Sequence, residues 1–154
     1  MVNVDLTEKR FEHDIEEYLL GHGYEQFSYQ DENGNWVYKH SFDASKCLYL
    51  DVLIDFISKT QPKEWKTYTK YYGAQAPEKL YKRLDAEINA HGLIHVLRKG
   101  INDMGIKLKV CFFKPESELN EKDNDLYKQN IIGVTRQFAF SQKTHETIDM
   151  VILE

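Results

Sequence analysis

An aspartate near the carboxyl end of the sequence has the surroundings of a metal ligand. Asp149 lies in an apolar run, Thr147 to Leu153, whose composition indicates a β-strand. The strand expected before it, Ile131 to Phe140, carries Arg136 and Gln137 beside an aromatic residue. This pattern indicates the first half of a metal-dependent nuclease site. The second half, a Glu-x-Lys on the next strand, would lie beyond the last residue, so we expect the N-terminal piece of a nuclease.

The chemistry of phosphodiester hydrolysis explains why an incomplete set of residues matters. One or two Mg²⁺ ions activate the attacking water and neutralise the charge that develops on the phosphate. Mg²⁺ prefers oxygen ligands and keeps several waters, so Asp149 alone is a poor anchor. We therefore expect weak metal affinity and no useful cleavage. The alternative is that Asp149 is an inert residue of an edge strand or a cap.

A second candidate carboxylate lies on the first expected helix. The helix is predicted from Thr7, as N-cap, to about Leu20, because apolar residues recur at helical spacing. Glu8 falls on the apolar stripe, and Glu12 lies at its edge. Glu8 could be directed at a metal or a basic site, or it could interact with the helix dipole in the first turn. For both glutamates, interaction with the helix dipole is the preferred interpretation. The stripe consists of Phe11, Ile15, Tyr18 and Leu19.

Another pair of carboxylates lies on the second expected helix, which spans Ala44 to Lys59 with Asp43 as its cap. Asp51 and Asp55 are one helical turn apart and could form a catalytic pair. Nothing else in the sequence converges on them, so a solvated polar face is the preferred interpretation.

Lysines alternate with aromatic residues in a short expected helix, Lys63 to Tyr72. Lys63, Lys66 and Lys70 could follow a phosphate backbone while aromatic rings stack on bases. In the preferred alternative, the aromatic residues of this helix form a buried stripe and the lysines face solvent. The stripe would consist of Trp65, Tyr68 and Tyr72.

The order of elements predicts the fold class. A hairpin or an excursion loop is expected from Gln26 to Tyr38, because Asn-Gly favours a tight turn. Helices are expected to fill the rest of a helical part, about 1–104, and strands a second part, about 105–154. Helices before strands indicate an α/β (α+β) fold. The remaining segments are helices over Pro77 to Ala90 and Leu93 to Asp103, a strand over Ile106 to Phe113, and a loop with one helical turn over Glu116 to Asn130.

The histidines His91 and His95 are four residues apart, as metal ligands on one helix face can be. Gly92 interrupts the pair, and the glutamate of an HExxH motif is missing, so metal binding here is disfavoured.

Length and charge bound the possible functions. A chain of 154 residues is expected to form one domain. The net charge of −5 conceals an asymmetry: residues 59–114 carry 12 basic and 5 acidic groups. Such a block can be a phosphate-facing surface or a solvated helical face.

No apolar segment reaches the length of a membrane span, and residues 1–10 lack the apolar core of a signal peptide. The spacing of Cys47 and Cys111 fits no metal motif. Two buried, reduced thiols are expected, which favours a cytoplasmic protein.

Segments along nearly the whole chain resemble the N-terminal region of the R subunits of type I restriction enzymes. The opening helix is similar over Thr7 to Glu12 and Leu19 to Tyr24. The more specific segments are Leu84 to Lys99 (LDAEINAHGLIHVLRK), Lys107 to Pro115 (KLKVCFFKP) and Asn130 to Val151 (NIIGVTRQFAFSQKTHETIDMV).

The resemblance implies a nuclease domain of the PD-(D/E)xK superfamily, with a restriction-endonuclease-like core that is truncated before the Glu-x-Lys. It implies Mg²⁺ as cofactor and double-stranded DNA as substrate. In that family, motor domains follow that hydrolyse ATP, and methylation and specificity subunits join the complex. The sequence contains no GxxxxGK[ST] motif, so an ATP role would belong to the parent protein.

By this resemblance, Asp149 matches the first metal-binding carboxylate and Glu8 the acidic residue of the opening helix. Arg136 and Gln137 match polar positions on the preceding strand, where they contact substrate or support the site. The Glu-x-Lys has no counterpart, and Glu154 is too close to Asp149 to replace its glutamate.

Two other classes remain open. The chain could be a non-catalytic module in which the basic helices bind DNA or another subunit, or it could be an unrelated helical scaffold. A sheet that ends at its third strand would also leave an open edge, which favours an edge-strand homodimer.

Overall fold

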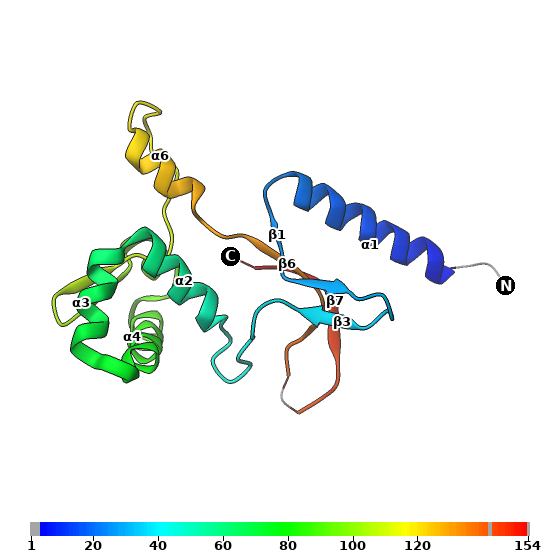
Figure 1. Ribbon diagram of the computed structural model, residues 1–154, viewed down its shortest axis with the longest axis horizontal. Helices are drawn as coiled ribbons and strands as arrows, with labels where there is room; N and C mark the ends of the chain where they lie inside the picture. Colours follow the sequence, from blue (N-terminus) through cyan, green and yellow to red (C-terminus); the bar gives the residue numbers. More distant parts are fainter. Residues whose placement is uncertain (1–3, 142, 154) are drawn as a thin grey trace. The chain divides into compact units, whose positions relative to one another are not determined.

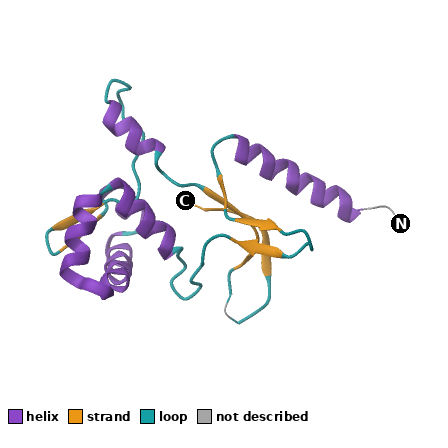
Figure 2. Cartoon of the chain, viewed as in Figure 1, coloured by secondary structure: helices purple, strands orange, loops and turns teal. Residues whose placement is uncertain are grey.

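The computed structural model describes residues 4–141 and 143–153 and mixes helices with strands, so the predicted α+β class is confirmed (Figures 1 and 2). The chain divides into two compact units. Unit 1 combines Met1–Cys47 with Ile131–Glu154, and unit 2 is Leu48–Asn130. This division differs from the expected change from helices to strands near residue 104. The single domain stays a prediction, because compact units can fold together or apart.

Unit 1 is built on a three-stranded sheet in the order β1-β6-β7. Strand β1 pairs with β6 in parallel, and β6 pairs with β7 in antiparallel orientation. Thus β6 is the central strand, and Asp149 lies on an outer strand. The elements of unit 1 are α1 (Val4–Gly21), β1 (Glu25–Gln26), β2 (Ser28–Gln30), β3 (Trp36–Tyr38), β6 (Gly133–Ala139) and β7 (Thr147–Leu153).

The expected hairpin is present, since β2 pairs with β3 in antiparallel orientation. Its turn is organised by Asp31, whose carboxylate accepts hydrogen bonds from the backbone N–H groups of Asn33 (2.9 Å) and Asn35 (2.8 Å). Gly34 provides the left-handed backbone, with a φ of 80°. These bonds lower the pKa of Asp31, chiefly through Asn35, because they stabilise the charged form.

A buried serine of the hairpin forms hydrogen bonds with the central strand. The Ser28 hydroxyl accepts a hydrogen bond from the backbone N–H of Arg136 (2.7 Å) and donates to the Arg136 carbonyl (3.2 Å). The preceding Phe27 is 3% exposed. A β-carbon placed on Gly133 would lie 2.6 Å from the Phe27 ring, so the ring packs directly on the β6 backbone.

Unit 2 is a helical assembly with one short hairpin. Its apolar core consists of fully or nearly fully buried side chains from α2, α3, α4, α5 and the β4–β5 hairpin. Among the largest of them are Ile57, Tyr68, Leu80, Val96 and Leu108. The elements of unit 2 are α2 (Leu50–Thr60), α3 (Pro62–Tyr72), η1 (Gly73–Gln75), α4 (Ala76–His91), α5 (Leu93–Lys99), β4 (Ile101–Asp103), β5 (Ile106–Leu108) and α6 (Glu121–Lys128).

Glycine and proline mark helix boundaries in unit 2, and α3 and α4 end near their predicted positions. Pro62 occupies the first turn of α3, where its missing N–H costs nothing. The helices α3, α4 and α5 end at Gly73, Gly92 and Gly100, each with a positive φ.

Two predicted helix boundaries are wrong at the amino end. Helix α1 begins at Val4, so Thr7 lies within it and is no N-cap. Helix α2 begins at Leu50 rather than at Ala44. Asp43 caps only an isolated turn, in which its carboxylate accepts a hydrogen bond from the backbone N–H of Ser45 (3.0 Å). Cys47 then has a positive φ of 50°, which is incompatible with a continuous helix.

The predicted helix over Leu93 to Asp103 is also too long. Gly100 ends α5, because a β-carbon there would lie 2.3 Å from the carbonyl oxygen of Leu108. The next residues form β4, which pairs with β5 across a two-residue turn at Met104 and Gly105, both with positive φ. The predicted strand from Ile106 pairs only as far as Leu108, and the expected loop contains a longer helix, α6.

The cysteines depart from one prediction, because Cys47 is exposed and Cys111 is half-buried, and they form no disulfide. Within residues 4–141 and 143–153, no helix combines the length and the apolar character that a membrane crossing requires.

Candidate functional site: an acidic cluster in unit 1

Asp149 projects from β7 opposite Gln137 of β6 and is exposed. The side-chain N–H of Gln137 donates a hydrogen bond to Asp149 Oδ1 over 3.2 Å. The Gln137 amide oxygen in turn accepts from the hydroxyl of Thr147 over 2.9 Å. This relay orients the Asp149 carboxylate, while Oδ2 receives none of these bonds.

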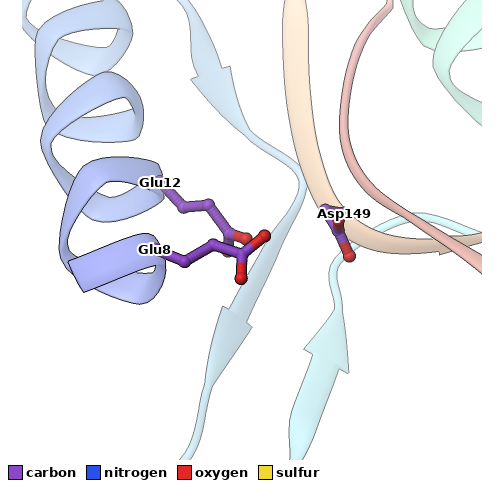
Figure 3. Close-up of side chains that lie close together, drawn as sticks. All are labelled: Glu8, Glu12 and Asp149. Carbon is purple, nitrogen blue, oxygen red and sulfur yellow. The ribbon is translucent and has the colours of Figure 1, made fainter. Parts of the chain in front are cut away.

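Helix α1 brings two glutamates to the same place. Glu8 and Glu12 are one turn apart and therefore share a face of the helix. Their carboxylates point from α1 toward the strand that carries Asp149 (Figure 3). One oxygen of each of the three side chains lies within 4.8 Å of the others. We call Glu8, Glu12 and Asp149 the acidic cluster.

The donors of the acidic cluster fit a hard divalent cation. Mg²⁺ takes carboxylate oxygens and completes its shell with water. Glu8 and Asp149 are exposed and Glu12 is half-buried, so water can reach the cluster. A bound cation would also offset the repulsion between neighbouring carboxylates. Glu8 and Asp149 would hold such an ion, with Glu12 as a third ligand.

A buried arginine lies beside the cluster. Arg136 is 8% exposed and forms ion pairs with Glu12, through Nη2, and with Glu16, through Nη1 at 3.5 Å. Its guanidinium carbon lies 5.1 Å from the centre of the Trp36 ring. The side-chain N–H of Gln26 donates to Glu16 over 3.2 Å. Arg136 is thus buried by acidic and aromatic neighbours, which favours support of the site over contact with substrate.

The backbone at Gln137 is unusual for a residue within a strand. Its φ is 49°, in the left-handed region that non-glycine residues seldom adopt. Its carbonyl accepts a hydrogen bond of 2.6 Å from the Tyr38 hydroxyl. Partial burial raises the pKa of Tyr38, so this donor keeps its proton over the neutral range. Outliers of this kind concentrate at functional sites, where neighbouring contacts hold them in place.

The structure brings together some of the candidates from the sequence and separates others. Glu8, Gln137 and Asp149 lie together in unit 1, and Arg136 contacts the acidic cluster through Glu12. Sequence reasoning placed Glu12 only at the edge of the apolar stripe and missed Glu16. The spacing of Glu8, Glu12 and Glu16 at successive fourth positions is the signal that could have identified both.

The three lysine candidates lie on α3 in unit 2, and all are exposed. The aromatic stripe of this helix is buried or half-buried, as the preferred interpretation expected, with Tyr68 fully enclosed. The lysines are Lys63, Lys66 and Lys70.

A Glu-x-Lys does occur in the sequence, at Glu64-Trp65-Lys66, and sequence reasoning passed over it. It lies on helix α3 of unit 2, not on a strand that follows Asp149. Glu154, the other acidic residue considered, lies outside the described residues.

The other candidate metal ligands and acids have ordinary surroundings. The rings of His91 and His95 lie 4.8 Å apart, and Glu87 is 3.7 Å from His91. Asp55 forms an exposed ion pair with Lys59 at 2.6 Å, as expected of a solvated helix face.

Comparisons of the chain with protein-family models, with curated proteins and with solved structures found no match.

Proposed function

We propose that unit 1 carries the metal-binding part of a DNA endonuclease site, and that the chain is the N-terminal region of a type I restriction-enzyme R subunit. One observation carries the proposal: α1 and β7, from opposite ends of the sequence, bring Glu8, Glu12 and Asp149 within 4.8 Å of one another. The resemblance over residues 84–99, 107–115 and 130–151 supports the choice of family.

The residues have separate roles in this proposal. Asp149 and Glu8 bind Mg²⁺, and Gln137 orients Asp149 by a hydrogen bond of 3.2 Å. When bound, Mg²⁺ supplies a Lewis acid for phosphate and a source of activated water. No Glu-x-Lys follows Asp149 in this sequence, so the 154-residue chain binds metal without cleaving DNA. ATP hydrolysis, and assembly with the methylation and specificity subunits, belong to the parent protein.

The first test measures binding of Mn²⁺, as a probe for Mg²⁺, by calorimetry. The wild type is expected to bind weakly, and Asp149→Asn and Glu8→Gln should each reduce the affinity by about tenfold, because a charged ligand is lost. Asp55→Asn is the matched control, since Asp55 is an exposed carboxylate paired with Lys59 in unit 2. Absence of binding by the wild type, or equal affinity in Asp149→Asn, would overturn the metal site.

The exposed lysines of α3 support DNA binding, either as part of the nuclease or in a module without catalysis. We expect duplex DNA to bind with an affinity that falls as salt rises, since phosphate contacts release counterions. Substituting Lys63, Lys66 and Lys70 by glutamine should lower the slope of log K against log salt by up to about three. The control carries Lys122→Gln and Lys128→Gln, in an acidic helix.

A cleavage gel with Mg²⁺ accompanies this titration. Binding without cleavage is the expected result. Cleavage by the wild type would overturn the proposal that the chain lacks a full catalytic set. Absence of DNA binding at low salt would remove α3 from the nucleic-acid surface and leave the acidic cluster to be judged by its metal affinity alone.

A further inference from the structure

Helix α1 turns its acidic side, rather than most of its apolar stripe, toward the sheet of unit 1. Most of its apolar stripe is exposed, with Phe11 66%, Ile15 36% and Tyr18 64% exposed, while Leu19 is half-buried. The acidic side turns inward instead, and Glu16 is only 6% exposed. Burial of the apolar stripe therefore contributes little to holding the helix on the sheet, and polar contacts must set its position.

Arg136 makes the central polar contacts with α1. Its guanidinium reaches two successive turns of the helix, at Glu12 and at Glu16. The side chains of Arg136, Glu12 and Glu16 are 10%, 17% and 8% exposed. Ion pairs that are this well shielded from water have strict geometry, because a displaced partner would leave a buried charge uncompensated.

The arginine is itself held firmly on the sheet. The Ser28 hydroxyl binds both its backbone N–H and its carbonyl, and the Trp36 ring lies beside the guanidinium. A fixed backbone and a fork of two nitrogens define where the two glutamates must lie.

The spacing of the glutamates links this contact to the acidic cluster. Glu8, Glu12 and Glu16 follow one another at every fourth residue, so they form a row along one side of α1. Arg136 binds the second and third members, and the first lies with Asp149. A slip of α1 by one turn would move Glu8 by about 5.4 Å, more than the span of the cluster.

We propose that Arg136 is a positioning residue: it sets the register of α1 on the sheet and thereby places Glu8 and Glu12 beside Asp149. The purpose of this placement, metal binding, rests on the proposed function. The positive charge of Arg136 also offsets repulsion among the carboxylates while no cation is bound.

The test compares Arg136→Lys with the wild type by two readouts. Lysine keeps the positive charge but loses the two-nitrogen fork, so a role of charge alone predicts no change. Positioning predicts faster hydrogen exchange of the α1 amides without metal, while the β6–β7 amides stay protected. It also predicts an affinity for Mn²⁺ about tenfold weaker, the effect expected when support of a metal ligand is lost. Arg98→Met, an exposed arginine of unit 2, is the control.

The outcomes separate the two proposals. Unchanged exchange in α1 overturns the positioning role, whatever happens to Mn²⁺ binding. Faster exchange with unchanged Mn²⁺ affinity overturns the link between Arg136 and the cluster. If the wild type itself binds no Mn²⁺, the metal site fails and the exchange result still decides the positioning. If Arg136→Lys loses protection in β6 and β7, Glu16→Gln, which removes one arm of the contact, decides by the same readouts.

Discussion

The two units bury different kinds of side chain. Unit 2 encloses an apolar core drawn from α2, α3, α4, α5 and the β4–β5 hairpin. Among the residues whose burial the structure describes, unit 1 buries fewer apolar ones, Phe27, Val134 and Phe138. It also buries the polar residues Glu16, Ser28, Thr135 and Arg136, whereas the buried polar residue of unit 2 is Gln61. Apolar burial is the larger source of stability, whereas buried polar groups demand specific partners. The candidate site therefore lies in unit 1, whose buried polar groups require specific partners and so fix the geometry. The larger apolar core, which contributes more to stability, lies in unit 2.

Truncation of the apolar core should produce the largest effect. Leu80 is fully buried, so Leu80→Ala should destabilise unit 2 by about 2–5 kcal/mol through lost contacts and a cavity. Each unit contains one tryptophan, Trp36 in unit 1 and Trp65 in unit 2. Denaturant unfolding followed by Trp65 fluorescence, in a Trp36→Phe background, measures the loss.

The same substitution followed by Trp36, in a Trp65→Phe background, tests whether the units are independent. Independence predicts an unchanged Trp36 midpoint. Equal shifts of the unfolding midpoint at both tryptophans would show that the units unfold together. Their stabilities could then not be compared separately. Leu93→Ala is the control, because Leu93 is 54% exposed.

A tight backbone contact should produce a smaller effect in unit 1. The β-carbon of Gly133→Ala would lie 2.6 Å from the buried Phe27 ring, which must move. We expect a loss of about 1–3 kcal/mol, as for other overpacked sites. The measurement is the Trp36 unfolding midpoint. Gly21→Ala, at a helical glycine with open space around it, should instead be neutral or slightly stabilising, and a loss there equal to that at Gly133 would contradict the steric explanation.

The smallest predicted effect is a loss of stability at alkaline pH. We expect this loss to be larger in unit 2 than in unit 1. Asp103 accepts hydrogen bonds from the hydroxyls of Tyr68 (2.9 Å) and Tyr72 (3.0 Å). Burial and this carboxylate raise the pKa of both phenols above the usual 10.0. The folded state therefore holds protons that the unfolded state releases, so the stability present below pH 10.0 is lost as the pH rises above it.

Tyr68→Phe separates this effect from others. It should remove part of the loss of stability at alkaline pH. At neutral pH it should lower the stability by about 1 kcal/mol, because a hydrogen bond is missing. In unit 1, Tyr38 has a raised pKa but donates to a backbone carbonyl rather than to a carboxylate, so the stability reported by Trp36 should fall less steeply with pH. A steeper loss of stability with pH in unit 1 than in unit 2 would contradict the assignment of this effect to Tyr68 and Tyr72.

Local signals in the sequence predicted local structure well. Glycine and proline marked the ends of α3 and α4, and the strand pattern identified β7 with its observed bounds. Sequence reasoning missed features that depend on distant partners. The parallel pairing of β1 with β6 joins segments from opposite ends of the chain, and no local pattern reveals it.

The candidate site shows the same limit. The strand pattern singled out Asp149, and helical spacing identified the apolar stripe of α1, but neither signal shows which side of α1 faces the sheet. Glu12 and Glu16 turn inward, because Arg136, far away in the sequence, provides the charge that compensates their burial. A hydrophobic pattern cannot show which face of a helix will meet a buried cation.

The division of the chain has a consequence for synthesis on the ribosome. Unit 2 is one continuous segment, Leu48–Asn130, and every residue of its core is available before β6 emerges. Unit 1 needs both ends of the chain. Until Arg136 leaves the ribosome, α1 has neither the sheet that receives it nor the cation that its glutamates bind. Helix α1 is therefore made before unit 2 but takes its place on the sheet only after β6 has been made, and the acidic cluster forms only when β7 has been translated.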